Sequence, residues 1–317
     1  MWVYTCRPGF DDDLAEEVRG RRIGPGLVAV DRPPAAWPVF GRAGFPVAAE
    51  VRPGDAPAAL AAALDAAFAG KPRAWTLLAW TPDTDETNPL APRADKLVGA
   101  LRPDLDLVRV PRADDAVRYG GFLAQVCLAA PERVLVGVMP AHDSPTLAPG
   151  GRARAGRPKD APSRAARKLE EAFAWIGRAP EPGETCVDLG AAPGGWTAVL
   201  LARRARVIAV DPARLAPNLA GRARHVQASA FDYAPDEPVD WLFCDMAWRP
   251  LEVAQLLAKW GRRGWANAMV SNIKLPMKQR VAFVRKVMAT VAEGGWRDLR
   301  GRQLYHDREE ITLSAWR

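Results

Sequence analysis

From Ser163 to the end of the chain, short hydrophobic runs alternate with amphipathic stretches. The runs are typical of buried strands, and the stretches repeat their apolar residues at the spacing of one helix face. Ser163 is expected to cap the first helix. The alternation predicts an α/β fold with a mostly parallel, doubly wound sheet. We expect strands at 185–190, 206–211, 239–245 and 267–275, and helices at 163–176, after Pro193, at 251–259 and at 276–293.

The last two predicted strands depart from this alternation. Residues 297–304 and 309–316 are both strand-like, and a short polar turn separates them, so they predict a hairpin. An antiparallel hairpin that closes a parallel sheet resembles the end of class I methyltransferase domains. We therefore expect a Rossmann-like class I methyltransferase domain over residues 163–317, with a mostly parallel seven-stranded sheet.

The first part of the chain has a less regular pattern. Its mixture of strand-like and helical stretches predicts an α+β region over residues 1–140. Residues 141–162 are rich in Pro, Gly and Arg without periodicity, which predicts a basic linker. The expected strands of this part are 2–6, 74–83 and 133–140, and the expected helices are 11–20, 56–70 and 92–103.

Composition and charge narrow the functional class. The chain of 317 residues is 49% hydrophobic but has no apolar run of the length that a membrane helix needs. Residues 1–140 hold 16 Lys/Arg against 18 Asp/Glu, whereas residues 141–317 hold 28 against 19, so the second part is better suited to a polyanion such as RNA. Four scattered cysteines and three histidines predict neither a metal site nor a disulfide framework. The N-terminus lacks a signal peptide, so we expect a cytoplasmic protein.

The segment CVDLGAAPGGWTAVLL, Cys186–Leu201, joins a predicted strand to a predicted helix through a loop of small residues. It is not a P-loop because no Gly-Lys-Ser/Thr follows the glycines, and Ala192 interrupts a full G-x-G-x-x-G. Glycines let a ligand approach the backbone, and the helix start offers unpaired N–H groups. We interpret this loop as the binding site of a nucleoside-like cofactor. The alternative is an ordinary strand–helix turn that binds no ligand.

Asp211 ends the next predicted strand and can accept hydrogen bonds from both ribose hydroxyls of an adenosine. It follows Gly190 by about 20 residues, a spacing that fits NAD as well as S-adenosylmethionine. The Pro-Gly-Gly turn and the closing hairpin favour S-adenosylmethionine. The predicted cofactor contacts are Gly190, Ala192, Pro193, Gly194, Gly195, Trp196, Asp211 and Asp245, with Ser229 or Asp232 near the adenine.

Four ionisable residues occupy places that an active site would use. Lys168 lies in the helix before the first strand, Asp245 and Lys274 end neighbouring strands, and Glu310 begins the last strand. Burial disfavours the charge of a lysine, so Lys274 is a candidate general base. Taken alone, each of these residues could be an ordinary surface charge or an ion-pair partner. Because all four are expected beside the cofactor loop, together they indicate a catalytic site.

This set is similar to the K-D-K-E tetrad of FtsJ-like ribose 2′-O-methyltransferases, and VDLGAAPGGWT is similar to their cofactor motif. Within that family, the chain resembles the RlmM-type enzymes, which methylate a cytidine ribose of large-subunit ribosomal RNA. The matching segments run from CRPGF to RQLYHDREEITL and include CDMAWRP and NIKLPMKQR. The resemblance implies a THUMP-type RNA-binding module within residues 1–140.

The resemblance also implies roles for the four residues. Lys274 would remove the proton of a ribose 2′-hydroxyl and Asp245 would orient it, while Lys168 would hold the nucleotide or the developing alkoxide and Glu310 would orient both lysines. Three alternatives stay open: a paralogue with another RNA target, an NAD-dependent oxidoreductase, and an inactive RNA-binding protein. The predicted phosphate contacts are Arg152, Arg154, Arg157, Lys159, Arg164, Lys278 and Arg280.

Overall fold

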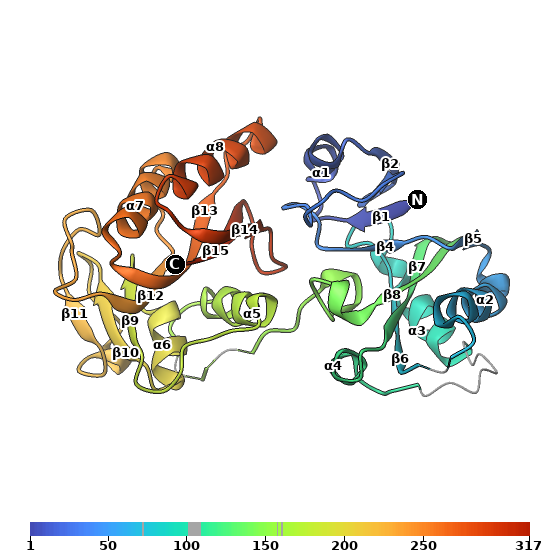
Figure 1. The fold of residues 1–317 in the computed structure, drawn as a ribbon, viewed down its shortest axis with the longest axis horizontal. Coiled ribbons are helices and arrows are strands. Elements are labelled where there is room, and N and C mark those ends of the chain that lie inside the picture. Colours follow the sequence, from blue (N-terminus) through green and yellow to red (C-terminus); the bar gives the residue numbers. More distant parts are fainter. Residues whose placement is uncertain (72, 101–108, 157, 160) are drawn as a thin grey trace. The chain divides into compact units, whose positions relative to one another are not determined.

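The computed structural model describes residues 1–71, 73–100, 109–156, 158–159 and 161–317. The chain divides into two compact units, Met1–Ala153 and Arg154–Arg317 (Figure 1). We call them unit 1 and unit 2. Within the described residues, no helix combines the length and the apolar character that would let it cross a membrane.

Unit 2 is built on a seven-stranded sheet with the strand order β11-β10-β9-β12-β13-β15-β14. The strands from β11 to β13 pair in parallel, and β15 pairs antiparallel with both β13 and β14. The predicted mostly parallel sheet and its closing hairpin are therefore confirmed. The strands are β9 Thr185–Leu189, β10 Arg206–Val210, β11 Arg224–Val226, β12 Val239–Cys244, β13 Ala266–Lys274, β14 Arg297–Arg302 and β15 Glu310–Trp316.

Four helices cover this sheet, with α5 and α6 on one face and α7 and α8 on the other (Figure 1). Aromatic side chains fill the core beneath α5, where Phe173 packs edge-on against Trp241 and Phe243. This arrangement is the doubly wound one that the alternation predicts. The helices are α5 Ala166–Ile176, α6 Gly195–Ala202, α7 Pro250–Arg263 and α8 Arg280–Ala292.

Two helix starts differ from the prediction. Helix α5 begins at Ala166, and its N-cap residue is Ala165, so the expected cap at Ser163 is wrong. Ser163 instead packs against the start of α6, because a Cβ added to Gly195 would lie 2.1 Å from its Oγ. Helix α8 begins at Arg280 rather than 276, because Gln279 has a left-handed backbone with φ 56° that a helix cannot continue through.

Unit 1 contains two four-stranded sheets with the orders β2-β3-β1-β4 and β5-β8-β7-β6, packed with helices. The predicted α+β mixture is confirmed, although β2, β3, β4, β5 and β7 were not predicted. The strands are β1 Trp2–Thr5, β2 Arg21–Gly24, β3 Leu27–Val30, β4 Ala43–Pro46, β5 Ala49–Val51, β6 Trp75–Trp80, β7 Phe122–Ala130 and β8 Arg133–Pro140. The helices are α1 Asp11–Val18, α2 Ala56–Phe68, α3 Ala91–Ala100 and α4 Ala113–Arg118.

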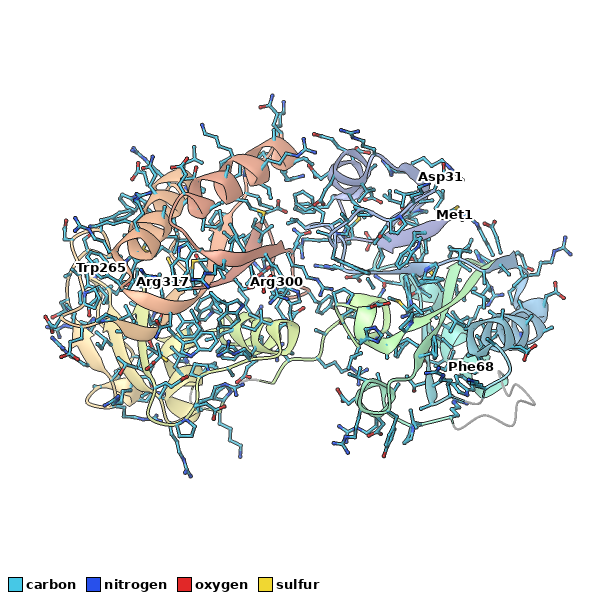
Figure 2. All side chains as sticks on the ribbon, in the orientation of Figure 1. Met1, Asp31, Phe68, Trp265, Arg300 and Arg317 are labelled. Atoms are coloured by element: carbon cyan, nitrogen blue, oxygen red, sulfur yellow. The ribbon has the colours of Figure 1, made fainter. Side chains whose placement is uncertain are left out.

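Helices α2, α3 and α4 of unit 1 pack against the second sheet, whereas α1 packs against β2 and β3 of the first sheet. Phe68, at the end of α2 (Figure 2), is buried and packs edge-on against Phe122 of β7. The predicted helix over 92–103 corresponds to α3, and its last three positions lie outside the described residues. The predicted linker contains two short 3-10 helices, η3 Ala141–Asp143 and η4 Pro149–Gly151. Three more are η1 Pro53–Asp55, η2 Asn88–Leu90 and η5 Pro217–Leu219.

Candidate active site

The candidate site lies in unit 2, at the carboxyl ends of the parallel strands. Strand β9 pairs with β10 on one side and with β12 on the other, so the strand order reverses there. Such a switch point is where open α/β sheets bind ligands. The segments after β9 and β12 touch at this point: a Cβ on Gly190 would lie 2.5 Å from Cγ of Met246, and the N–H of Asp245 donates to the carbonyl of Leu189 at 3.3 Å.

The loop after β9 is hydrogen-bonded to the carboxylate of Asp211, which follows β10. Asp211 accepts the backbone N–H of Ala192 on Oδ2 at 3.0 Å and that of Ala213 on Oδ1 at 2.8 Å. Gly194 has φ 111°, a left-handed value that favours glycine, and it immediately precedes α6. A carboxylate oxygen that accepts one N–H can still accept a hydroxyl. The loop, the helix start and Asp211 therefore fit the ribose and the amino-acid part of a nucleoside cofactor.

Two of the predicted cofactor residues make other contacts, and a third is exposed. The side chain of Trp196 is buried in the core, and its Nε1 donates to the carbonyl of Ala165 at 3.0 Å. Ser229 accepts the N–H of Phe231 on its hydroxyl at 3.2 Å, which stabilises a turn after β11. Asp232 is exposed. The adenine contacts of Ser229 and Asp232 stay predictions.

The four ionisable residues meet at the same edge of the sheet. Lys274 and Glu310 are direct partners across the antiparallel pair of β13 and β15, and their side chains form an ion pair. Lys168 comes from α5, forms an ion pair with the other oxygen of Glu310, and places its Nζ 3.8 Å from Oδ2 of Asp245. We call these four residues the tetrad. Glu310 joins its two lysines.

Burial and charge act in opposite directions within the tetrad. Burial on its own would lower the pKa of Lys168, but Asp245 and Glu310 outweigh it, so this pKa is raised and the ammonium form is favoured. Burial would raise the pKa of Glu310, but the two lysines hold it below its ordinary value. Burial also raises the pKa of Asp245, and Lys168 offsets this only in part. Lys274 is the most exposed member, at 38% of its side chain.

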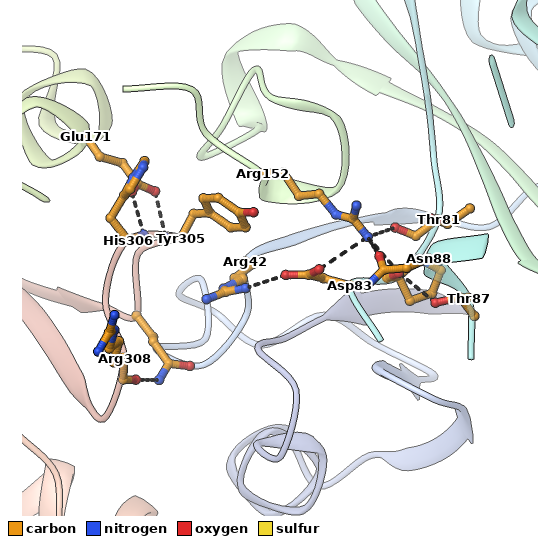
Figure 3. Close-up of polar contacts among 12 residues, drawn as sticks. Arg42, Thr81, Asp83, Thr87, Asn88, Arg152, Glu171, Tyr305, His306 and Arg308 are labelled. Carbon is orange, nitrogen blue, oxygen red and sulfur yellow. Dashed lines mark hydrogen bonds and ion pairs between the residues drawn. The ribbon is translucent and has the colours of Figure 1, made fainter. Parts of the chain in front are cut away.

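The turn that precedes Glu310 is fixed by a residue that the sequence analysis did not single out. Glu171 of α5 accepts the backbone N–H groups of Tyr305 and His306 at 2.7 and 2.9 Å and the Nδ1 of His306 at 2.7 Å (Figure 3). Glu171 follows Lys168 by three positions and so lies on the same helix face. One helix therefore supplies a tetrad lysine and holds the loop that carries Glu310.

A pocket of about 640 Å³ opens beside the tetrad within unit 2. Lys168, Lys274 and Glu310 form part of its lining. Most of the other polar side chains around it are basic, so a phosphate group or a sugar–phosphate backbone is electrostatically suited to it. These other lining residues include Arg164, Arg167, His306 and Arg308.

The predicted phosphate contacts have different surroundings. Arg164 lines this pocket, while Arg154, Lys159 and Lys278 are exposed in unit 2. Arg280 forms an ion pair with Glu309 at 3.2 Å. Arg157 lies outside the described residues.

Arg152 belongs to unit 1 and is held there by several acceptors. Its Nη2 donates to the carbonyl of Pro82 at 2.8 Å and to Oδ1 of Asn88 at 2.7 Å, and it lies 3.5 Å from Asp83 (Figure 3). A phosphate would have to compete with these bonds. Across the described ranges, no cluster of three His, Cys, Asp or Glu side chains is arranged to hold a metal ion.

Comparison with known proteins gives matches to a family model and to relatives that cover nearly the whole chain. The family model described as "FtsJ-like methyltransferase" matches residues 161–273. The chain is 37% identical over 357 residues to "Ribosomal RNA large subunit methyltransferase M" of Alkalilimnicola ehrlichii, covering 100% of this chain and 94% of the relative. The protein of the same name from Halorhodospira halophila is 36% identical, covering 100% and 96%, and that from Xanthomonas campestris pv. campestris is 34% identical, covering 98% of each chain.

Proposed function

The chain belongs to the family of ribosomal RNA large subunit methyltransferase M, and we propose that it methylates a ribose 2′-hydroxyl of large-subunit ribosomal RNA. The observation that carries this proposal is the tetrad, in which Glu310 joins Lys168 and Lys274 beside Asp245. A methyl transfer to an alcohol needs a proton acceptor and a positive charge near the oxygen, and the two lysines supply these roles.

The proposed methyl donor is S-adenosylmethionine, which supplies a methyl group on a positively charged sulfur. The backbone of residues 190–195 and the start of α6 hold its amino-acid part, and Asp211 accepts its ribose hydroxyls. Asp211 is already oriented by the N–H groups of Ala192 and Ala213, so it loses little freedom on binding. Ser229 and Asp232 are the proposed neighbours of the adenine.

The tetrad divides the work between its two lysines. Lys168 keeps its proton, because two carboxylates raise its pKa, and it stabilises the developing alkoxide. Lys274, which is more exposed and reaches the pocket, takes the proton of the 2′-hydroxyl. Glu310 fixes both ammonium groups, and Asp245 orients the reacting groups from the cofactor side. Positioning and proton removal together supply the catalysis.

The basic pocket is the proposed place of the target nucleotide. Arg164, Arg167 and Arg308 contact phosphates there, and contacts by Arg154, Lys159 and Lys278 extend along the RNA. Unit 1 is the proposed RNA-binding region, of the THUMP type that the sequence resembles. We further propose that the methylated nucleotide is a cytidine and that the protein works in the cytoplasm, where ribosomal RNA is found.

The test is a methylation assay on ribosomal RNA from cells that lack this protein. The purified chain is incubated with this RNA and S-adenosylmethionine, and new ribose methylation is mapped as resistance of one position to alkaline cleavage. Wild-type protein should protect a single cytidine of the large-subunit RNA. Glu310→Gln should lower the rate about 10²-fold or more, while Glu293→Gln, on an exposed carboxylate away from the tetrad, should not. A methyl group on a base, or no methylation, would refute the proposal.

A further inference from the structure

His306 lines the pocket beside the tetrad, and a buried carboxylate holds its imidazole in place. Glu171 is 7% exposed, and its Oε2 lies 2.9 Å from the backbone N of His306 and 2.7 Å from Nδ1 of the ring (Figure 3). Its Oε1 accepts the backbone N–H of Tyr305 at 2.7 Å. The ring therefore has a fixed position in the wall of the pocket.

The bond to Glu171 decides which ring nitrogen carries a proton. Both oxygens of Glu171 accept backbone N–H groups, as those of an ionised carboxylate do, and a carboxylate has no proton to give. Nδ1 must therefore be the donor. Nε2 is then an acceptor when the ring is neutral and an N–H donor when the ring is charged. In the described part of the chain, Nε2 has no hydrogen-bond partner.

The free nitrogen is the one that a pocket ligand can reach. The two nitrogens of an imidazole lie on different edges of the ring, so Nε2 points away from the carboxylate that binds Nδ1. His306 belongs to the lining of the pocket, whereas Glu171 does not. The carboxylate thus supports the ring from behind, and the edge that carries Nε2 is left for a ligand.

The charges around the imidazole favour an anion as this ligand. Both glutamates of the pocket lining are already paired with cations. Glu310 is paired with Lys168 and Lys274, and Glu309 is paired with Arg280. The other charged residues of the lining are arginines, which leave the pocket with an excess of positive charge. They are Arg164, Arg167 and Arg308.

A phosphate and a hydroxyl would use different states of the ring. A hydroxyl would donate to Nε2 of the neutral ring, whereas a phosphate oxygen would accept the N–H of the charged ring. With a phosphate on Nε2 and Glu171 on Nδ1, the charged imidazole lies between two anions. Hydrogen bonds of this charge-assisted kind are stronger than neutral ones. The phosphate therefore fits the surroundings better than the hydroxyl does.

We propose that His306 binds a phosphate of the RNA at the target nucleotide, with Nε2 donating to a phosphate oxygen while Glu171 holds Nδ1. The inference rests on the proposed function, because it takes the pocket as the place of that nucleotide. An imidazole that is already fixed loses little freedom on binding. Glu171 shares α5 with Lys168, so the bound phosphate has a defined position relative to the tetrad.

The test separates the two ring nitrogens with two substitutions. In His306→Asn the amide nitrogen can take the place of Nδ1 on Glu171, but nothing replaces Nε2. In His306→Gln the longer side chain brings an amide N–H to the place of Nε2. His142→Asn is the matched control, because His142 is an exposed histidine beside the carboxylate of Asp143 and outside the pocket. The affinity for a ribosomal RNA fragment that contains the methylated position is measured, together with the affinity for S-adenosylmethionine.

We expect His306→Asn to weaken RNA binding about tenfold, with the affinity for S-adenosylmethionine within about twofold of wild type. His306→Gln should bind RNA more tightly than His306→Asn, and His142→Asn should match wild type. Wild-type affinity of His306→Asn would overturn the inference. Weaker binding by His306→Gln than by His306→Asn would also overturn it, because the bond to Glu171 would then be what matters. A wild type that does not methylate ribosomal RNA would instead overturn the proposed function.

A second measurement uses the unchanged residue, in case substitutions at position 306 disturb the turn. The chain has three histidines, so nitrogen NMR of histidine-labelled protein can assign His306 with the help of His142→Asn and His225→Asn. With the RNA fragment bound at neutral pH, both ring nitrogens of His306 should carry a proton. A complex in which Nε2 has no proton would show that it accepts from a hydroxyl, and the phosphate contact would be refuted.

Discussion

In unit 1, Asp83 receives the guanidinium groups of Arg42 and Arg152 at 3.4 and 3.5 Å, whereas in unit 2 Glu310 receives the ammonium groups of two lysines. Both carboxylates thus hold two cations. In unit 1 the cations are arginines, which stay protonated in proteins. Arg152 is also bound to backbone carbonyls, and Arg42 is buried (Figure 3).

The tetrad differs in two physical respects. Its cations are lysines, which can give up a proton, and it borders a pocket at the carboxyl ends of parallel strands. Two cations around one carboxylate therefore do not identify a catalytic site. A removable proton and access for a substrate separate the tetrad from the arginine cluster of unit 1.

The largest expected effect tests the removable proton. Lys274→Ala should lower turnover by about 10² to 10⁴, with little change in the affinity for RNA or S-adenosylmethionine. Lys274→Arg should fail as well, because a guanidinium does not accept a proton. Single-turnover methylation kinetics give the measurement. An arginine variant with near-wild-type turnover would show that position 274 supplies charge, and Asp245 or water would become the base.

The sequence made the tetrad predictable because each member stands at a strand end or on a helix that periodicity locates. The arginine cluster of unit 1 was not predictable in this way. Arg42, Asp83 and Arg152 stand in irregular segments outside the strands and helices, and no local pattern brings them together. The same holds for Glu171, whose partners Tyr305 and His306 lie far along the chain.

The missed strands of unit 1 have a similar explanation. Strands β2, β3, β4 and β5 have three or four residues each, which is too short for an alternation of polar and apolar positions to stand out. Strand β7 is longer, but it is apolar on both faces and so lacks that alternation. Tertiary pairing, rather than local pattern, decides these segments.

A buried carboxyl that forms no ion pair within the described part of the chain extends the comparison. Asp188 of β9 is 1% exposed, and its Oδ2 accepts the hydroxyl proton of Thr197 at 2.6 Å. Burial raises the pKa of Asp188 from 3.8 to about 7. The folded state therefore binds this proton more tightly than the unfolded chain. The stability that the protonated form contributes is complete below about pH 4 and is lost as the pH rises through about 7.

Asp188→Asn should remove this pH dependence. The difference between the free energies of unfolding of the variant and of wild type should therefore increase with pH. Above pH 8 the variant should be more stable than wild type by a value on the order of 4 kcal/mol. Urea unfolding at several pH values gives the measurement. Asp236→Asn is the control, because that carboxylate is exposed. Parallel pH curves for wild type and Asp188→Asn would contradict the neutral, buried state of this carboxyl.

The arginine cluster should matter for stability rather than for chemistry. Arg42→Met removes a buried cation from Asp83 and should lower the free energy of unfolding of unit 1 by about 3 kcal/mol. Arg22→Met, which breaks the exposed pair with Asp12, should cost less than about 1 kcal/mol. Urea unfolding followed by the tryptophans of unit 1 reports both. Equal effects of the two variants would remove the distinction between a buried and an exposed pair.

The smallest expected effect compares two arginines that the sequence placed in one class. Arg164 lines the pocket beside the tetrad, whereas Arg152 is held by acceptors within unit 1. A phosphate contact releases a counterion, so its loss makes the dependence of RNA affinity on salt less steep. Arg164→Met should reduce the slope of log affinity against log salt by about 0.7 to 0.9. Arg152→Met, compared at a temperature where both variants are folded, should leave that slope unchanged.

Titrations of labelled ribosomal RNA fragments at four salt concentrations give both slopes. If Arg152→Met changed the slope as much as Arg164→Met, Arg152 would also contact RNA. The arginine cluster of unit 1 could then no longer be called purely structural, in contrast to the basic pocket beside the tetrad.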